Sequence, residues 1–119
     1  MLLDGRRVNS CLILAVSQAG ARVVTVEGLA TPEQPHPVQR GFLQHDGFQC
    51  GYCTPGQICS AVGMLTEVER GWPSVVTVPG DPEPDLLTDA EIRERMSGNL
   101  CRCGAYPNMV PAIREAAGR

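Results

Sequence analysis

Aromatic residues are scarce in this chain of 119 residues, since phenylalanine, tryptophan and tyrosine make up 4% of the sequence. A hydrophobic core therefore has to be built mainly from Val, Leu, Ile, Ala and Met. A chain of this length holds one ordinary domain, or one small domain with a fragment of another. Because such a core supplies limited stability, we expect a bound metal to contribute to its order.

Clusters of basic residues are also missing, and the net charge is −3. Nucleic acids and anionic membranes attract concentrated positive charge, so we expect neither as a partner. The longest wholly apolar run covers residues 11–16, whereas a membrane-spanning helix needs about 18 apolar residues or more. We therefore expect no membrane insertion. Asp4, Arg6 and Arg7 interrupt the N-terminus, which argues against a secretory signal within these residues.

Six cysteines are present, and four of them form two close pairs. Cys50 and Cys53 have the spacing C-x-x-C, while Cys101 and Cys103 have the spacing C-x-C. Such close pairs are poor long-range disulfide links, but two pairs from separate loops can bind one metal centre from two sides. Four thiolates suit either a structural zinc ion or a [2Fe-2S] cluster, and the spacing alone leaves both open.

The surroundings of these cysteines favour an anionic ligand set. Cys53 stands at the N-terminus of an expected helix, where the helix dipole and free N–H groups favour the thiolate, so we predict a lowered pKa for its thiol. Gly51 and Gly104 permit tight turns and leave N–H groups near the sulfurs, where hydrogen bonds tune a reduction potential.

Other titratable residues are predicted to have structural roles. Cys59 lies inside the helix expected after Cys53 and should pack as a small hydrophobic residue. His36 and His45 flank a short expected helix without a metal-like pairing, so we predict cap or surface positions for them. Arg102 is predicted to be a structural or interface contact rather than a catalytic group. Neither cysteine motif suggests a nucleophile with its base.

Residues 1–29 are predicted to be extended. Asp4-Gly5 is a hairpin turn signal, and residues 22–26 are rich in β-branched side chains. Because the sequence contains no partner strands upstream of these segments, they form only part of a sheet. Residues 30–37 contain three prolines and are predicted to be a linker.

Four helices are predicted in the remainder, with an irregular connection over residues 72–87. The expected helix termini are Pro37 and Gly47 for the first helix, with Gly47 as a left-handed C-cap, and Thr54 as N-cap and Gly71 for the second. A capping box of Thr88 and Glu91 opens the third, which ends near Gly98. The fourth begins after Asn108 with Pro111 in its first turn. The side chains of Glu67, Glu69 and Arg70 are predicted to form a solvated helix end.

Two long strings carry a resemblance to a known family. FQCGYCTPGQICSAV, residues 48–62, and MSGNLCRCGAYPNMVPAI, residues 96–113, resemble the [2Fe-2S] subunits of the xanthine dehydrogenase and aldehyde oxidoreductase family of molybdenum hydroxylases. The similarity continues through LLDGRRVNSCLILAV and VVTVEGL, so it covers essentially the whole chain. The sequence most closely resembles the small subunit of bacterial three-subunit aldehyde oxidoreductases. This resemblance strongly favours a [2Fe-2S] cluster over a structural zinc ion.

The resemblance implies a mainly α fold, with a four-helix [2Fe-2S]-binding domain at residues 31–119 and a partial β-grasp ferredoxin-like domain at residues 1–30. It implies one complete cluster, and it places two residues against the molybdopterin of a partner subunit, Gln49 and Cys103. The implied cluster ligands are Cys50, Cys53, Cys101 and Cys103.

Cys11 matches the distant ligand of the family's second cluster, held in the ferredoxin-like domain by a C-x4-C-x2-C group and one further cysteine. The other three cysteines are not in this sequence, so the second site is incomplete. Met1 to Gly5 align with the middle of a strand in the family pattern. We therefore expect that the start has been misplaced or that the gene is truncated.

The function that the resemblance implies is electron transfer by a non-catalytic subunit. Electrons would pass one at a time from a molybdopterin-binding large subunit, through this chain, to an FAD-binding medium subunit. Two other interpretations stay open: a zinc-stapled four-cysteine interaction module, and a nonfunctional truncated remnant. The compartment, cytoplasmic or periplasmic, is not indicated, and neither are the substrate, the potential and the final acceptor.

Overall fold

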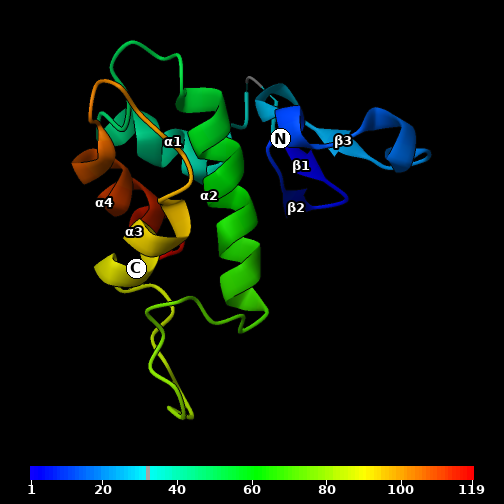
Figure 1. The fold of residues 1–119 in the computed structure, drawn as a ribbon. Helices are drawn as coiled ribbons and strands as arrows, with labels where there is room; N and C mark the ends of the chain where they lie inside the picture. Colours follow the sequence, from blue (N-terminus) through cyan, green and yellow to red (C-terminus); the bar gives the residue numbers. More distant parts are fainter. Residues whose placement is uncertain (32) are drawn as a thin grey trace.

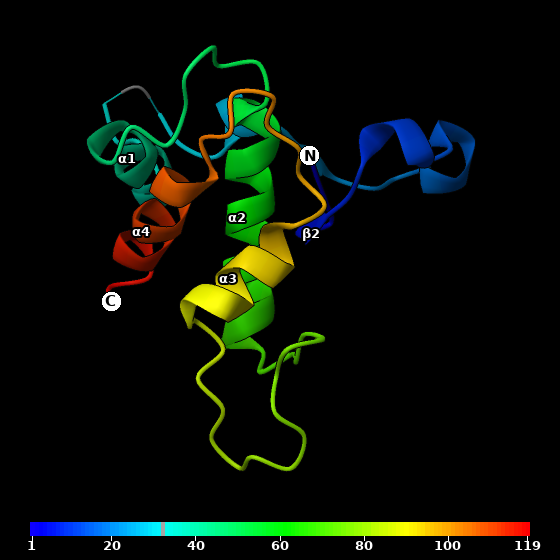
Figure 2. The same ribbon diagram turned by 60° about the vertical axis from the view of Figure 1, so that its left-hand side comes forward.

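The computed structural model describes residues 1–31 and 33–119. Its elements, in chain order, are β1 (Leu2–Leu3), β2 (Arg6–Arg7), η1 (Ser10–Leu12), η2 (Ala15–Gln18), β3 (Val23–Val24), η3 (Val26–Gly28), α1 (Pro37–Gln44), α2 (Thr54–Glu69), α3 (Asp89–Met96) and α4 (Tyr106–Ala116). Helices α1, α3 and α4 lie on one side of the long helix α2, and the small sheet lies on the other (Figures 1 and 2). The predicted order of strands followed by four helices is confirmed for the described residues.

The hairpin predicted at Asp4-Gly5 is present. Leu2 pairs with Arg7 and Leu3 with Arg6 in an antiparallel register. The two turn residues have φ values of 49° and 80°, the left-handed conformation that a two-residue hairpin turn requires. β3 lies within the predicted strand of residues 22–26 and pairs with the other edge of β1, which makes the sheet order β2-β1-β3.

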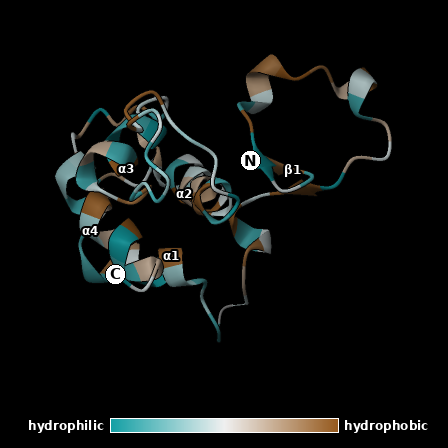
Figure 3. Cartoon of the chain, turned by 90° about the horizontal axis from the view of Figure 1, so that it is seen from below, coloured by the Kyte–Doolittle hydropathy of each residue, from teal (hydrophilic) through white to brown (hydrophobic). Residues whose placement is uncertain are grey.

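The apolar run of residues 11–16 is not extended as predicted. It falls largely within η1 and η2, whose backbone hydrogen bonds are local, such as Leu12 N–H to Asn9 O. Leu12, Leu14 and Val16 are 76%, 73% and 87% exposed, so packing does not hold this segment against a sheet. Figure 3 shows it as part of an open ring that stands apart from the helices.

Helix α1 begins as predicted and ends differently. The His36 side chain accepts a hydrogen bond from Val38 N–H, which confirms its cap position. At the other end the left-handed residue is Asp46, with φ 51°, rather than Gly47. Gly47 is needed for space instead, because a Cβ there would lie 3.0 Å from the ring of Phe42.

Three predictions at other helix ends need correction. Thr54 is the first residue of α2 rather than its cap, and the cap position belongs to Cys53. Thr88 caps Glu91 N–H as predicted, but the carboxylate of Glu91 binds other groups, so the capping box is half formed. α4 begins at Tyr106, because Pro107 already suits a first turn, and Pro111 lies inside the helix.

The core lies among the four helices, and among the described residues Phe42 is the fully buried aromatic side chain. Cys59 is buried, as predicted. The side chains that form the centre of this core are Val38, Phe42, Ala61, Met64, Ile92 and Ile113. α1 and α4 approach closely enough that a Cβ on Gly41 would lie 2.5 Å from the carbonyl oxygen of Ala112. In the part of the chain that the structure describes, no helix is long and apolar enough to cross a bilayer.

We expect Gly41→Ala to lower the free energy of unfolding by about 1–3 kcal/mol, because α1 and α4 have to separate to admit the methyl group. The gain in helix propensity of about 1 kcal/mol offsets only part of this cost. Urea unfolding followed by circular dichroism measures the change. The matched control is Gly56→Ala in α2, where the new Cβ would meet only Asn99 Nδ2 at 3.8 Å, and where stability should not fall. Equal midpoints for the two variants would contradict the packing argument.

Candidate metal centre

The two cysteine pairs lie on loops at the same end of the helical part. The loop of Cys50 and Cys53 leads into the N-terminus of α2, and the loop of Cys101 and Cys103 joins α3 to α4. Figures 1 and 2 both show these loops near the N-terminal end of α2. The two loops that carry the cysteine pairs therefore lie at one end of α2, as the two-loop interpretation of the spacing predicts.

The four thiols differ in their exposure and proximity. Cys101 is buried, Cys53 and Cys103 are half-buried, and Cys50 is exposed. Cys53 and Cys101 are near enough to influence each other's ionisation, and Cys50 also acts electrostatically on Cys53. Among the described residues, no group of three or more His, Cys, Asp or Glu side chains lies close enough together to hold a metal ion. The structure thus brings Cys53 and Cys101 together, while Cys50 on the same loop as Cys53 is exposed.

Both predicted glycine turns are present in these loops. Gly51 has φ 81° and Gly104 has φ 70°, a region that side chains rarely adopt. A Cβ at either position would meet no atom within 4 Å. The requirement for glycine is therefore set by the backbone conformation and not by space.

Backbone amides surround the sulfur of Cys101. The amide of Ala105 is the largest cause of a lowered pKa for the Cys101 thiol, and the Cys53 thiol and the amides of Cys103 and Gly104 add to it, while burial acts in the opposite direction. Hydrogen bonds to the charged form favour the thiolate. This end of the site is therefore prepared for an anionic ligand, as predicted for Gly104.

The prediction of a lowered pKa for Cys53 is wrong. Burial raises the pKa of the Cys53 thiol to about 11, and the neighbouring thiol of Cys101 adds to the rise. The loss of hydration and a second ionisable thiol outweigh the helix end, because both disfavour the charged form. In the metal-free chain the pKa of the Cys53 thiol is therefore raised, while the pKa of the neighbouring Cys101 thiol is lowered.

A buried glutamine of α2 contacts the loop that contains Cys101 and Cys103. The sequence predictions did not include this residue. Gln57 is 1% exposed and donates from Nε2 to the carbonyl of Asn99 at 2.7 Å. Asn99 donates in return from Nδ2 to the carbonyl of Gly56 at 3.3 Å. Another hydrogen bond lies within the loop between α3 and α4, where Cys101 N–H donates to the hydroxyl of Tyr106 at 2.5 Å. The available signal was a glutamine directly before Ile58, where the buried face of α2 begins.

The remaining candidates lie at or outside the edge of the site. Gln49 is exposed beside Cys50. Cys11 is exposed on η1, outside the cysteine loops. His45 Nε2 lies 2.6 Å from Glu115 Oε2 and so connects α1 to α4. Arg102 is exposed between the two cysteines of its loop.

Comparison with protein-family models decides the family. Residues 25–114 match the model described as a [2Fe-2S] binding domain. The chain belongs to this family. The matched range includes all four cysteines of the two loops and ends inside α4.

Curated relatives are named as subunits of oxidoreductases. The chain is 58% identical to the aldehyde oxidoreductase iron-sulfur-binding subunit PaoA of Escherichia coli, over 99% of this chain and 51% of that protein. It is 37% identical to a nicotinate dehydrogenase subunit of Pseudomonas putida, over 98% of this chain and 64% of that protein. The chain therefore spans about half the length of PaoA. The predicted membership among iron-sulfur subunits of aldehyde- and xanthine-type oxidoreductases is confirmed.

Solved structures of two oxidoreductases share the fold. Quinoline 2-oxidoreductase from Pseudomonas putida 86 superposes with a TM-score of 0.72 at 39% identity, over 99% of this chain and 66% of that chain. Aldehyde oxidoreductase from Desulfovibrio gigas superposes with a TM-score of 0.76 at 33% identity, over 98% of this chain and 12% of that chain. Both matches extend over the sheet as well as the helices.

The residues present fit a [2Fe-2S] cluster by their donor chemistry. Four cysteine thiolates are the usual ligand set of such a cluster, and the chain supplies four on two facing loops. The amides at the Cys101 sulfur match the hydrogen bonds that stabilise an anionic cluster.

A titration of the metal-free chain tests the opposed acidities. Folding raises the pKa of the Cys53 thiol from 9.0 to about 11. The stability that this protonated thiol contributes is therefore fully present below pH 9.0. It is lost as the pH rises through about 11. In Cys101→Ala the pKa of Cys53 should fall only part of the way, since burial is the larger cause. Thiolate absorbance against pH measures both values. A Cys53 titration unchanged by the substitution would contradict the coupling of the two thiols.

Removing the connecting glutamine tests the hydrogen bond between the loops. We expect Gln57→Leu to lower the free energy of unfolding of the metal-free chain by about 1–3 kcal/mol, because the carbonyl of Asn99 loses its donor inside the protein. Gln44→Leu at an exposed position of α1 is the control, with an expected change within about 0.5 kcal/mol. Denaturant unfolding compares the two variants. Equal free energies of unfolding would show that the hydrogen bond from Gln57 to Asn99 does not stabilise the chain.

Proposed function

We propose that this chain is a non-catalytic electron-transfer subunit that carries one [2Fe-2S] cluster on Cys50, Cys53, Cys101 and Cys103. The observation that carries the proposal is the position of the two cysteine loops at the N-terminal end of α2, where Cys53 and Cys101 are neighbours. The family match over residues 25–114 and the names of the relatives support it.

The division of labour follows the two parts of the chain. Residues 31–119 form the cluster-binding helical domain, and residues 1–30 form part of a ferredoxin-like β-grasp domain. The small β2-β1-β3 sheet and the exposed apolar side chains of residues 12–16 support this division. Cys11 would be one ligand of a second cluster in that domain.

Two partners follow from this role: a large subunit, which binds molybdopterin, and a medium subunit, which binds FAD. Gln49 and Cys103 face the pterin in this assembly. Beside them, Tyr52 and Leu100 are 94% and 82% exposed, and apolar side chains of this size at one end of a domain suit a protein interface. The names of the relatives, an aldehyde oxidoreductase and a nicotinate dehydrogenase, support an aldehyde or an aromatic heterocycle as the substrate of the large subunit.

The cluster, when bound, supplies the transfer of one electron at a time. The chain's own residues hold it and tune it. The amides around Cys101 stabilise negative charge on the sulfurs, and burial of Cys101 keeps water from that side. Cys50 is exposed and Cys103 is half-buried, so an electron from the large subunit would enter on this side.

Anaerobic purification followed by iron and sulfide analysis tests the proposal. We expect two irons and two sulfides per chain, as in a [2Fe-2S] domain, and one paramagnetic resonance signal after reduction with dithionite. Cys53→Ala and Cys101→Ala should abolish this signal, because each removes a ligand. The control Cys59→Ala should retain it, since this buried thiol lies outside the four.

The alternatives give different outcomes in the same experiment. Stoichiometric zinc without iron would identify a zinc-stapled interaction module. No bound metal, with no association with molybdenum or flavin subunits, would identify a nonfunctional remnant. Either result would overturn the electron-transfer proposal.

A further inference from the structure

A group of charged side chains connects the N-terminal hairpin to the helices, and the proposed function makes no use of it. Arg7 of β2 donates from Nε to Glu67 Oε1 at 2.8 Å and from Nη2 to Glu67 Oε2 at 2.9 Å. Its Nη1 donates to Ser60 Oγ at 3.2 Å and to the carbonyl of Arg95. One guanidinium thus contacts both α2 and the C-terminal part of α3. The prediction that Glu67 is a solvated residue is therefore wrong.

The network continues into the interior through Arg95. Its Nη1 lies 3.9 Å from Glu67 Oε2, its Nε donates to Glu91 Oε2 at 3.0 Å, and its Nη2 donates to the carbonyl of Trp72 at 2.7 Å. The side chains of Arg95 and Glu91 are 3% and 4% exposed. Each charge therefore has an opposite partner, as buried charges require, and Arg7 joins a network that is already held in place.

The backbone of α2 leaves room for this arginine. A Cβ on Gly63 would lie 2.8 Å from Cβ of Arg7 and 3.2 Å from Cδ2 of Leu2. Leu2 is 6% exposed, so the first strand is buried at the same point. Packing at Gly63 and the two-pronged contact with Glu67 are independent observations, and both fix the hairpin on α2.

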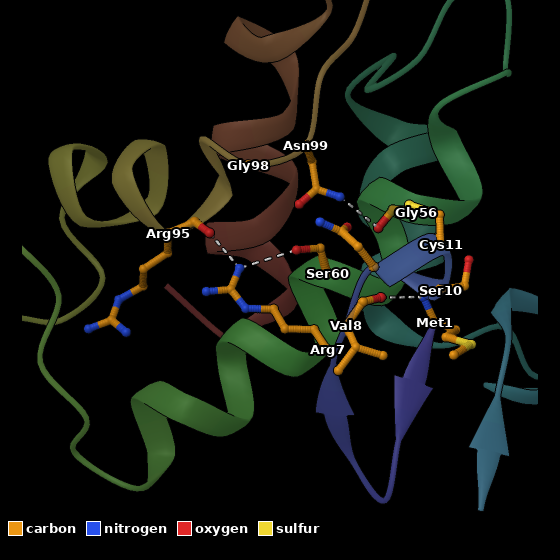
Figure 4. A pocket seen from close by; sticks show the side chains of 11 residues that line it. Met1, Arg7, Val8, Ser10, Cys11, Gly56, Ser60, Arg95, Gly98 and Asn99 are labelled. Carbon is orange, nitrogen blue, oxygen red and sulfur yellow. Dashed lines mark hydrogen bonds between the residues drawn. The ribbon is translucent and has the colours of Figure 1, made fainter. Parts of the chain in front are cut away.

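A cavity of about 420 Å³ lies between this hairpin and the cysteine loops. Figure 4 shows Cys11 and Ser10 on one side, Gly56 and Asn99 near the top, and Arg7 at the bottom. Gly56 lies three residues after Cys53, and Asn99 lies two residues before Cys101. The hairpin therefore sets how far the Cys11 segment stands from the four-cysteine site.

We propose that Arg7 is a positioning residue, which holds the Cys11 segment at a fixed separation from the four-cysteine site across this cavity. The functional part rests on the proposed function, because the part of the chain that contains Cys11 would then keep a fixed place beside the one cluster that this chain carries. The geometric part stands on the contacts of Arg7 alone. A lysine cannot replace it fully, since a single ammonium group cannot make the paired contact with Glu67.

The first experiment measures that separation. A nitroxide is attached to Cys11 in cluster-loaded, anaerobically purified protein carrying Cys59→Ala, so that the four ligand thiols are protected by iron. Relaxation of the nitroxide by the reduced cluster then reports the distance. We expect a narrow distribution for the parent and for Arg6→Met, an exposed neighbour on the same strand. Arg7→Met should broaden and lengthen it, and Arg7→Lys should recover it only in part.

The second experiment needs no cluster. Amide hydrogen exchange in the metal-free chain should be about tenfold faster in residues 2–8 for Arg7→Met than for Arg6→Met, because this unit opens locally once its anchor is lost. Exchange in the core of α2 should stay unchanged, which shows that the variant is folded.

The outcomes separate the two levels of the proposal. Unchanged exchange in Arg7→Met, or faster exchange with an unchanged distance in the loaded protein, would overturn the positioning role. If no variant binds iron, the proposed function fails, while the exchange contrast still decides whether Arg7 anchors the hairpin.

Discussion

The hydrogen bond from the buried Gln57 to the carbonyl of Asn99 connects the two parts of the candidate metal centre. It joins the first turns of α2 to the chain that leaves α3, and so it sets the position of one cysteine pair relative to the other. A neutral amide suits this place, because it supplies a donor to a half-buried carbonyl without adding a charge beside the cysteine loops. The loops themselves can then bend at Gly51 and Gly104 without moving the helices.

Helix α2 serves as the common support of both halves of the molecule. One face contributes Ala61 and Met64 to the helical core, while the opposite face accepts the hairpin at Gly63 and pairs Glu67 with Arg7. The loop of Cys50 and Cys53 leads into its N-terminus. Helix α2 therefore contacts the candidate metal centre, the helical core and the sheet, and the Arg7 contact fixes the hairpin on it.

Local signals predicted much of this structure. The Asp4-Gly5 turn and the cap of Thr88 depend on neighbours within a few residues, and both are found where the sequence indicates. Predictions failed where distant groups intervene. Glu67 was predicted to be solvated because its own helix end is polar, yet its partner Arg7 is 60 residues away in the chain.

The acidity of the cysteines shows the same division. The sequence by itself determined the donor set, the family and the glycine turns, because ligand type and spacing are local properties. Only the tertiary structure decided that Cys53 and Cys101 are neighbours, that burial raises the pKa of Cys53, and that Gln57 contacts the loop of Cys101 and Cys103. Burial and long-range hydrogen bonds arise from the packing of whole helices, so no short stretch of sequence contains them.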